Sequence, residues 1–351
     1  MYINTINNIY VLYSTYRPMH ESTDYKDIQK PFLKWVGGKT QIIEQILSRI
    51  QKSSPIRDYH EPFVGGGSVL FGVLSLRKKG LIDIQGYIYA YDANRTLIDA
   101  YRHVQTVPDA LYDLTKYYVD KYNNILVTSK RSQRDPCMNE HDALLSKDNY
   151  YYWLRKRFND ITNCPFGSLE RSALFIFLNK TCFRGLYREG PKGFNVAYGH
   201  YRQTPYIIDK AQIHAISELI KGVRFIHTNF QSCTTVWNET FERDFVYIDP
   251  PYAPESSKSF VDYVSSGFGY ETHIELFKKI KSMTQRGVRF LMSNSNVQIV
   301  HEQFDDKRDI NVCNGISPPS MRYHIDEVKA RRSINSKNPG SMTTEILVYN
   351  W

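Results

Sequence analysis

Along most of the chain, short apolar runs typical of buried strands alternate with segments that have the 3.6-residue apolar spacing of helices. The apolar runs predict strands at residues 58–63, 86–91, 223–227, 245–249, 288–293 and 344–349. The helical spacing predicts helices at residues 40–50, 68–79, 92–101 and 273–285. Strands that alternate with helices indicate an α/β fold with a mostly parallel sheet.

Two parts of the chain depart from this alternation. Residues 1–29 are rich in Asn, Tyr and Ser and match neither period, so we expect a loose N-terminal arm. Residues 103–215 are rich in Tyr, Lys, Arg and Asn, with helical spacing at 111–122 and 150–158 and a loop-like composition at 128–142. We therefore predict an α/β domain formed by residues 30–102 and 216–351, interrupted by a mostly helical, basic domain at 103–215.

Charge and composition narrow the class of protein only slightly. The 351 residues contain 45 Lys and Arg against 36 Asp and Glu, which gives a formal net charge of +9. An excess of this size is compatible with nucleic-acid binding, although a solvated basic surface explains it equally simply. The 27 Tyr and 18 Phe residues include candidates for stacking on bases, but we expect most of them in the core.

Cysteine usage and the apolar runs exclude other classes. The five cysteines are scattered without a C-x-x-C pair or Cys/His zinc spacing, so we predict no metal site and a reducing compartment. No apolar run is long enough to span a membrane, and the N-terminus lacks the pattern of a signal peptide. The expected location is the cytoplasm.

The strongest candidate for chemistry is Asp249-Pro250-Pro251-Tyr252, which closes the apolar run Phe245–Ile248. The second proline restricts the backbone, so the strand ends in a rigid corner that presents a carboxylate, carbonyl oxygens and an aromatic ring. The carboxylate and a carbonyl can each accept one hydrogen of an exocyclic amine while the ring stacks on its base. This corner therefore predicts a site for a flat heteroaromatic amine.

Two further segments are weaker on their own. The turn Gly65-Gly66-Gly67 comes after a predicted strand, where glycines allow close approach to the backbone, but its spacing matches neither the dinucleotide fingerprint nor the P-loop. Asp92 ends the next strand, where an acid either grips ribose hydroxyls or caps the adjoining helix. The segment FLKWVGGK at residues 32–39 suggests a loop around a charged ligand, although a turn into a helix with a surface lysine is the simpler interpretation.

Taken in order, these segments resemble the adenine-specific DNA methyltransferases of the Dam type, in their α group. The matching pieces are FLKWVGGK at 32–39, EPFVGGGS at 61–68, DAN at 92–94, Asn179, GLYR at 185–188, FNV at 194–196 and DPPYAP at 249–254. The resemblance covers roughly residues 30–350. It implies a class I methyltransferase fold with a seven-stranded, mostly parallel sheet and an inserted target-recognition domain at 103–215.

The resemblance also implies a cofactor and roles for residues. S-adenosylmethionine is the expected methyl donor, with Asp249 near both the donor and the target amine and Tyr252 stacked on a flipped base. The expected cofactor-binding residues are Trp35, Lys39, Phe63, Gly65, Asp92, Asn229, Phe230 and Asp249. Asn229 stands where the family often has an acid that reads the cofactor adenine, and an amide oxygen can still accept from an amine.

Recognition of DNA is expected from the basic loop at residues 184–193 and from the C-terminal region. The candidate DNA-binding residues are Arg184, Tyr187, Arg188, Lys192, Arg331 and Arg332. An Arg in a groove can read guanine, whereas the same charges are also compatible with a solvated loop or with contacts to phosphates only. The chain departs from the family pattern at Arg184, usually Asn, and at Ala197, usually Pro.

The predicted activity is methylation of adenine N6 in duplex DNA, with GATC as the expected target by resemblance. A monomer suffices, because the two strands of a palindromic site can be methylated in separate encounters. A cognate restriction endonuclease is a candidate partner, and the sequence leaves its existence open. Two alternatives stay open on sequence alone: methylation of adenine in RNA, and a DNA-binding module that retains the fold without catalysis.

Overall fold

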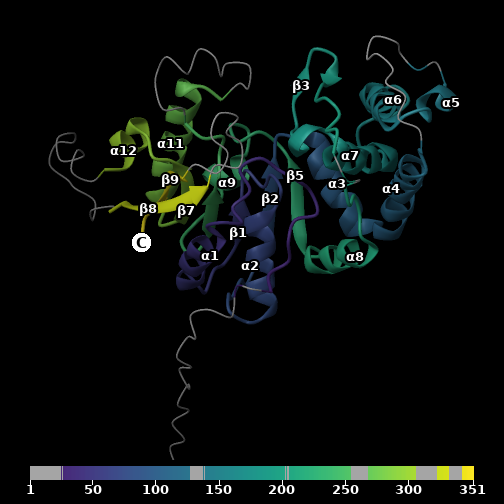
Figure 1. The fold of residues 1–351 in the computed structure, drawn as a ribbon. Helices are drawn as coiled ribbons and strands as arrows, with labels where there is room; N and C mark the ends of the chain where they lie inside the picture. Colours follow the sequence, from purple (N-terminus) through teal and green to yellow (C-terminus); the bar gives the residue numbers. More distant parts are fainter. Residues whose placement is uncertain are drawn as a thin grey trace, which may run out of the picture.

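The sheet confirms the predicted α/β architecture and adds one strand. A computed structural model describes residues 25, 27–126, 137, 139–201, 203, 205–253, 268–305, 322–331 and 342–351. The seven strands are β1 (Tyr59–Glu61), β2 (Ile88–Asp92), β5 (Val223–His227), β6 (Phe245–Ile248), β7 (Arg289–Ser295), β8 (His324–Arg331) and β9 (Met342–Tyr349). Their order is β5-β2-β1-β6-β7-β9-β8 (Figure 1). β9 runs antiparallel to both of its neighbours.

The strand that pattern reasoning missed is β8. Its sequence, HIDEVKAR, mixes charged residues into the alternation because β8 is the edge strand and pairs only with β9. An edge strand needs less apolar sequence than a central one. All six predicted strands are confirmed, with each end within two residues of its predicted position.

Successive residues of the central strands face two different layers, as the two-residue period of a strand requires. Tyr247 and Leu291 belong to the apolar core that contains α1 (Ile43–Lys52), α2 (Ser68–Lys78) and α3 (Arg95–Thr106). Ile248 and Met292 belong to a second core with α9 (Thr234–Asn238), α11 (Tyr270–Thr284) and α12 (Gln298–Phe304). Because β6 is buried on both faces, its sequence reads as one continuous apolar run.

The insertion packs beside the β5 edge of the sheet (Figure 1). It comprises α4 (Pro108–Asn123), α5 (Glu140–Ala143), α6 (Lys147–Asn159), α7 (Leu169–Thr181), α8 (Lys210–Leu219) and the hairpin β3 (Glu189–Gly190) and β4 (Gly193–Phe194). α7 packs on both α3 and α4, and its buried residues join the same core as α1–α3. The predicted boundaries at 102/103 and 215/216 fall inside α3 and α8.

Several predicted local features are corrected by the structure. The first helix begins at Ile43 rather than residue 40, and residues 140–142 of the predicted loop belong to the short helix α5. α7 was not predicted, because ten of its thirteen residues are buried and no amphipathic period remains. Most of the predicted N-terminal arm lies outside the described residues.

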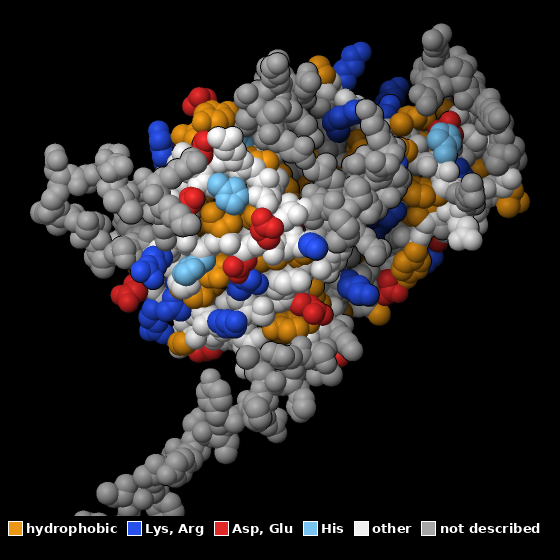
Figure 2. Space-filling view, turned by 60° about the vertical axis from the view of Figure 1, so that its left-hand side comes forward, with side chains coloured by type: hydrophobic (Ala, Val, Ile, Leu, Met, Phe, Trp, Pro, Cys, Tyr) orange, Lys and Arg blue, Asp and Glu red, His pale blue; other side chains and the backbone are white. Residues whose placement is uncertain are grey.

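Surface charge is mixed on the side of the molecule nearest to α12 and the β8 edge. Figure 2 shows basic and acidic side chains interspersed there, without a continuous patch of one sign. This face therefore has the solvated charge distribution of an ordinary protein surface.

Candidate active site

The predicted chemical residues meet at the carboxyl ends of four adjacent strands. The glycine turn comes after β1, Asp92 ends β2, Asn229 and Phe230 come after β5, and the Asp249 corner comes after β6. These strands are neighbours in the order β5-β2-β1-β6. Ligands of parallel α/β sheets bind outside this end of the strands, so the topology gathers the segments into one candidate site.

An ion pair joins the Asp249 corner to the segment FLKWVGGK. The ammonium of Lys39 lies 2.8 Å from Oδ2 of Asp249, and their side chains are 3% and 19% exposed. Lys39 Nζ also donates to the Gly37 carbonyl at 2.6 Å and lies 4.8 Å from the centre of the Tyr252 ring. The interpretation of Lys39 as a surface lysine is therefore wrong.

The protonation of Asp249 reflects opposing influences. Burial raises the pKa of the Asp249 carboxyl above its usual value, while Lys39 and a hydrogen bond from Ser293 act in the opposite direction. The Ser293 hydroxyl lies 3.0 Å from Oδ1. Burial also raises the pKa of Glu61 on β1 well above its usual value, and the nearby Asp249 adds to this shift. The site thus holds two buried acids beside one lysine.

The rest of the corner is fixed by hydrogen bonds to neighbouring elements. The Tyr252 hydroxyl donates to Oε2 of Glu345 on β9 at 2.7 Å, and the Ala253 amide donates to Oδ1 of Asn294 on β7 at 3.1 Å. His273 Nε2 on α11 lies 3.1 Å from the Pro251 carbonyl oxygen. These contacts hold the ring and the backbone of the corner in one arrangement.

The glycine turn also has a structural reason that involves no ligand. A Cβ atom on Gly65 or Gly66 would lie 2.9 Å or 2.7 Å from side-chain atoms of Trp35, so the close neighbour that these glycines admit is the Trp35 side chain. Gly65 also has a φ of +48°, which favours glycine. Trp35, predicted at the cofactor pocket, thus lies directly against the turn.

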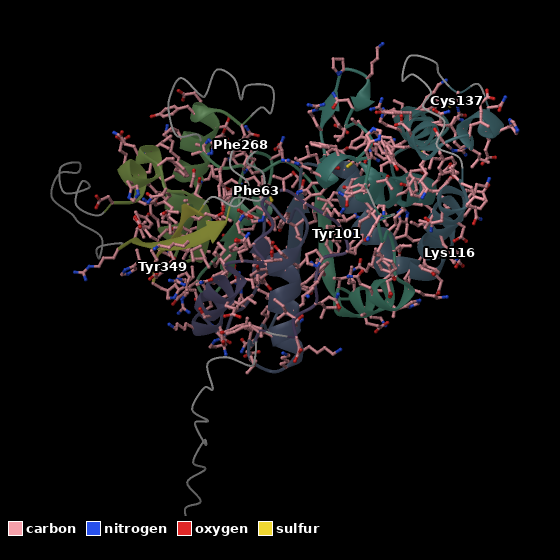
Figure 3. All side chains as sticks on the ribbon, in the orientation of Figure 1. Phe63, Tyr101, Lys116, Cys137, Phe268 and Tyr349 are labelled. Carbon is pink, nitrogen blue, oxygen red and sulfur yellow. The ribbon has the colours of Figure 1, made fainter. Side chains whose placement is uncertain are left out.

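Aromatic side chains form a cluster next to this turn. The ring centre of Phe63 lies 5.8 Å from that of Phe230 and 6.0 Å from that of Phe268, and the latter two are 5.3 Å apart. Figure 3 labels Phe63 and Phe268, which lie close together above the strand ends. Phe230 is buried, and such a cluster is suited to stack on a heteroaromatic ring.

Asp92 is a strand-end acid and not a helix cap. Its Oδ2 accepts from the Gly65 amide at 3.0 Å and its Oδ1 from the Asn94 amide at 2.8 Å. The N-cap of α3 is Asn94, whose side chain accepts from the Leu97 amide at 3.0 Å. Burial raises the pKa of Asp92, and the two amides oppose the shift. Each carboxylate oxygen retains a lone pair for a hydroxyl.

Asn229 lies on the exposed turn after β5. Its Oδ1 already accepts from the Ser232 amide at 2.8 Å, as in an Asx turn. This bond stabilises the turn that places Phe230 in the aromatic cluster. The oxygen has a second lone pair, so the bond is compatible with the predicted contact to an amine.

Four of the six predicted DNA-binding residues lie on and around the β3–β4 hairpin. Arg184, Arg188 and Lys192 are exposed. Tyr187 is half-buried, with its ring stacked on Trp35 at 5.8 Å, so it supports the hairpin base against the segment FLKWVGGK. Arg331 ends β8, and Arg332 lies outside the described residues.

Asn179, which matches the family pattern, joins the insertion to the segment FLKWVGGK. Its side chain accepts from the Lys34 amide at 2.9 Å and donates to the Lys34 carbonyl at 2.7 Å. Asn179 is buried at the end of α7, immediately before the hairpin region. These two hydrogen bonds to one backbone residue therefore tie the hairpin to the loop that carries Trp35 and Lys39.

Sequence reasoning missed Ser293, Asn294 and Glu345. The signal available was the polar pair Ser293-Asn294 inside an otherwise apolar strand, since both are fully buried and buried polar groups need partners. Glu345 gives no such signal, because it follows two threonines in the polar first part of β9, before the apolar run Ile346–Val348, where a charged residue is ordinary.

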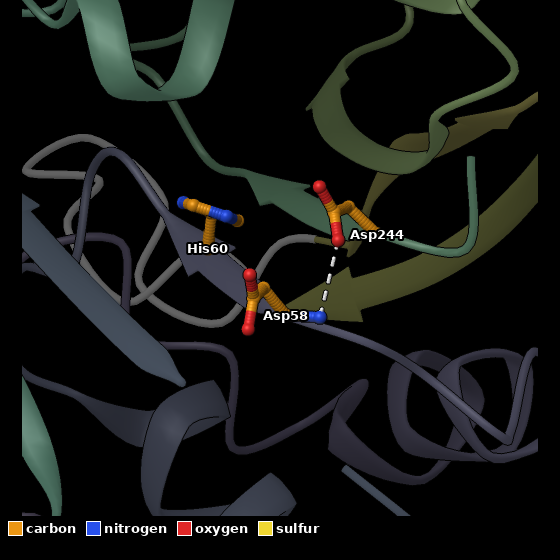
Figure 4. Close-up of side chains that lie close together, drawn as sticks. All are labelled: Asp58, His60 and Asp244. Atoms are coloured by element: carbon orange, nitrogen blue, oxygen red, sulfur yellow. Dashed lines mark hydrogen bonds between the residues drawn. The ribbon is translucent and has the colours of Figure 1, made fainter. Parts of the chain in front are cut away.

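A group of potential metal ligands lies elsewhere and has a structural explanation. Asp58, His60 and Asp244 place ligand atoms within 4.8 Å of one another (Figure 4). Asp244 is already engaged by the Arg57 guanidinium and by the Asp58 amide, at 2.7 Å and 3.2 Å. Asp58 and Asp244 precede β1 and β6, at the sheet end opposite the candidate site. The cluster ties the two strand starts together.

Comparisons with a family model and with individual known proteins all identify methyltransferases as similar to this chain. A sequence model of the family described as D12 class N6 adenine-specific DNA methyltransferase matches residues 35–334. The type II methyltransferase M.MjaIII of Methanocaldococcus jannaschii is 34% identical, covering 88% of this chain and 93% of the relative. The type II methyltransferase M1.LlaDCHI of Lactococcus lactis is 30% identical, covering 92% and 95%. The DNA adenine methylase of Escherichia coli K12 is 28% identical, covering 88% and 90%.

Among the described residues, no helix combines the length and the apolar character that crossing a bilayer requires.

Proposed function

Because this chain belongs to the family of D12 class N6 adenine-specific DNA methyltransferases, we propose that it transfers the methyl group of S-adenosylmethionine to N6 of adenine in GATC within duplex DNA. The observation that carries the catalytic assignment is the group formed by Asp249, Lys39 and Tyr252 beside Asp92 at the strand ends. GATC rests on the likeness of residues 185–188 and 194–199 to GATC-methylating members of the family.

The residues present fit the proposed cofactor in their chemistry. Asp92 has carboxylate lone pairs for ribose hydroxyls, and the cluster of Phe63, Phe230 and Phe268 suits the adenine ring. Lys39 carries a buried ammonium that suits the carboxylate of the methionine end. When bound, S-adenosylmethionine would supply a methyl group on a positively charged sulfur.

The Asp249 corner would activate and place the acceptor amine. The amine lone pair is delocalised into the adenine ring, so it is a poor nucleophile. Because His273 engages the Pro251 carbonyl, we assign the Pro250 carbonyl and Asp249 as the acceptors of the two amine hydrogens. Accepting both favours a pyramidal nitrogen with a free lone pair. After the new N–C bond has formed, one amine proton would pass to the Asp249 carboxylate that accepts its hydrogen bond and from there to water. Alignment at the strand ends supplies most of the remaining acceleration.

The target base has to leave the helix to reach this corner. Flipping costs a few kcal/mol, and stacking on the Tyr252 ring returns about 1–3 kcal/mol. Lys39 lies near that ring and Glu345 holds its hydroxyl, so the ring is positioned before the base arrives.

We propose that the insertion at 103–215 recognises the target through the β3–β4 hairpin. Arg188 and Lys192 are exposed there and suited to the major-groove acceptors of guanine, while Arg184, Arg331 and Arg332 would bind phosphates or bases nearby. The positive net charge supports general DNA affinity, which should fall steeply with salt. The type II methyltransferase names of two relatives support a cognate restriction endonuclease as a partner.

Methylation of defined substrates tests this function. Purified protein with labelled S-adenosylmethionine is expected to methylate duplex DNA that contains GATC, with N6-methyladenine as the product. The matched controls are a duplex with the site scrambled, the same site in double-stranded RNA, and Asp249→Ala protein. Transfer to RNA alone would refute the DNA substrate, and N6-methyladenine in another DNA sequence would refute GATC while leaving the reaction in place.

A further inference from the structure

Two buried hydroxyl groups, which have no role in the proposed reaction so far, form consecutive hydrogen bonds that lead to Asp249. The Ser293 hydroxyl is 3.0 Å from Oδ1 of Asp249, and the Tyr247 hydroxyl is 2.9 Å from Oγ of Ser293. Ser293 and Tyr247 are fully buried. A buried hydroxyl in a central strand lowers stability unless it is hydrogen-bonded, so these two hydrogen bonds account for a serine directly after the apolar run Phe290–Met292 of β7.

The sheet register explains why these groups meet. β6 and β7 are parallel neighbours, with Ile248 opposite Met292. The next position along each strand is Asp249 and Ser293, so their side chains lie on the same face. Tyr247 is two residues before Asp249 and therefore faces the same side. The contact follows from the register of β6 and β7, because Asp249 is the first residue after β6.

Only one assignment of donors and acceptors satisfies both hydrogen bonds. A serine has a single hydroxyl hydrogen, and an ionised carboxylate only accepts. Ser293 therefore donates to Asp249, and its oxygen accepts from Tyr247. Burial raises the pKa of Tyr247 well above its usual value, so the phenol keeps the proton that it donates. Hydrogen bonds in such a chain polarise and strengthen one another.

We propose that Ser293, oriented by Tyr247, is a positioning residue for methyl transfer that holds Oδ1 of Asp249 and thereby directs Oδ2 toward the target amine. The inference rests on the proposed role of Asp249. Oδ2 also contacts Lys39, and a carboxylate oxygen has lone pairs for both the ammonium and an amine hydrogen. Without Ser293 the carboxylate could rotate toward Lys39 and present neither oxygen correctly.

The ionisation of Asp249 provides a readout that distinguishes positioning from packing. The charged or titratable groups that face Asp249 are Lys39 before α1, Glu61 on β1, Tyr247 on β6, Tyr252 in the corner and Glu345 on β9. Lys39 and Ser293 lower the pKa of Asp249, and Glu345 raises it. Because Ser293 stabilises the ionised form, its removal should raise the pKa of Asp249, and activity should then be lost at a higher pH than in the wild type.

The test compares Ser293→Ala, Ser293→Thr and Tyr247→Phe across pH in single-turnover methylation of duplex DNA. Ser293→Ala is expected to lower the methyl-transfer rate about 10- to 100-fold, as for a hydrogen bond to a charged group. Its acidic limb should move to higher pH, while affinities for S-adenosylmethionine and DNA stay within about twofold. Ser293→Thr keeps the hydroxyl and should restore both the rate and the limb. Tyr247→Phe should shift the limb less, in the same direction.

Each outcome decides the inference. A Ser293→Ala enzyme with a wild-type limb, or a loss that Ser293→Thr does not restore, would indicate packing and overturn it. If Ser293→Ala does not fold, Tyr247→Phe decides, and an unshifted limb in that variant overturns the inference. Asp249→Ala distinguishes failure of the proposed function from failure of this inference. If Asp249→Ala methylates DNA like the wild type, the proposed function of Asp249 is wrong. If Asp249→Ala is inactive and Ser293→Ala behaves like the wild type, only the role of Ser293 is rejected.

Discussion

Lys39 and Asp249, far apart in the chain, form a buried ion pair with 2.8 Å between the ammonium and the carboxylate. The pair connects the loop before α1 to the corner after β6. Lys39 therefore contacts two residues of this corner. It favours the ionised form of Asp249, and it lies beside the Tyr252 ring. Substitutions at this ion pair and at the residues around it are therefore expected to change methyl transfer, stability and the pH dependence of the rate.

Lys39→Met is expected to shift the pH dependence of methyl transfer. The lysine charge lowers the pKa of Asp249, which burial raises. Without that charge the pKa of Asp249 rises further, so the rate should begin to fall at a higher pH than in the wild type and recover as the pH increases. Single-turnover rates measured across the acidic limb of the pH profile, for the variant and the wild type, test this. Lys221→Met, which removes an exposed charge after α8 that pairs with Glu218, is the control away from the site. A uniform loss of rate at every pH would contradict the prediction.

Asp249→Ala is expected to abolish methyl transfer and to leave the protein folded but less stable. It removes the acceptor of the amine hydrogen and leaves the Lys39 ammonium buried without its carboxylate. Breaking a buried pair in this way costs about 3–5 kcal/mol. Adding Lys39→Met should recover much of the stability without recovering activity. Thermal unfolding and methylation assays on the three variants measure both effects, and activity within about tenfold of the wild type would reject the assignment of Asp249.

Tyr252→Ala should lose about 1–3 kcal/mol of the stabilisation of a flipped base, because the stacking face is removed. Tyr252→Phe should keep most of it, since the hydroxyl bonds Glu345 rather than the base. Glu345→Gln, which keeps a hydrogen-bond acceptor for that hydroxyl, serves as the control for the ring's support. Fluorescence of 2-aminopurine at the target position reports flipping. Equal signals from the alanine variant and the wild type would exclude the stacking role.

Asp92→Ala should weaken binding of S-adenosylmethionine more than binding of DNA. The ribose hydroxyls would lose a charged acceptor that contributes about 1.5–3 kcal/mol. Asn94→Ala is the matched control, because Asn94 caps α3 and its loss should cost about 1 kcal/mol of stability while sparing cofactor affinity. Titration calorimetry and thermal unfolding separate the two effects. Equal loss of cofactor affinity in both variants would show that loop stability, not the carboxylate, controls binding.

Arg188→Ala and Lys192→Ala are expected to distinguish base reading from phosphate binding on the hairpin. Removing the residue that reads the outer guanine should reduce the free energy of binding to GATC by about 1–3 kcal/mol and should relax specificity at that base. A phosphate contact should weaken all sequences alike and reduce the salt dependence of binding. Competition between GATC and singly substituted duplexes at several salt concentrations measures both. If neither variant changes affinity or specificity, the hairpin is a solvated loop.

The sheet and the location of the site could be predicted from the amino-acid sequence alone. The central strands are buried on both faces, so their apolar runs are readable without tertiary information. A parallel sheet places the loops after its strands at one end, which brings the Asp249 corner, the glycine turn and Asp92 together. β8 and α7 escaped prediction, because an edge strand and a wholly buried helix lack the amphipathic periods that local patterns provide.

The partner of each polar group, in contrast, depends on tertiary packing. Pattern reasoning places Lys39 on a turn and favours solvent, whereas the fold buries it against a carboxylate after β6. Pattern reasoning cannot decide whether Asp92 binds ribose hydroxyls or caps the next helix, and the structure shows that Asn94 is the helix cap. The link from Tyr247 through Ser293 to Asp249 depends on the register of two neighbouring strands. Hydrophobic burial reflects local composition, but a hydrogen bond or ion pair requires two atoms within about 3 Å, and that is set by packing between distant segments.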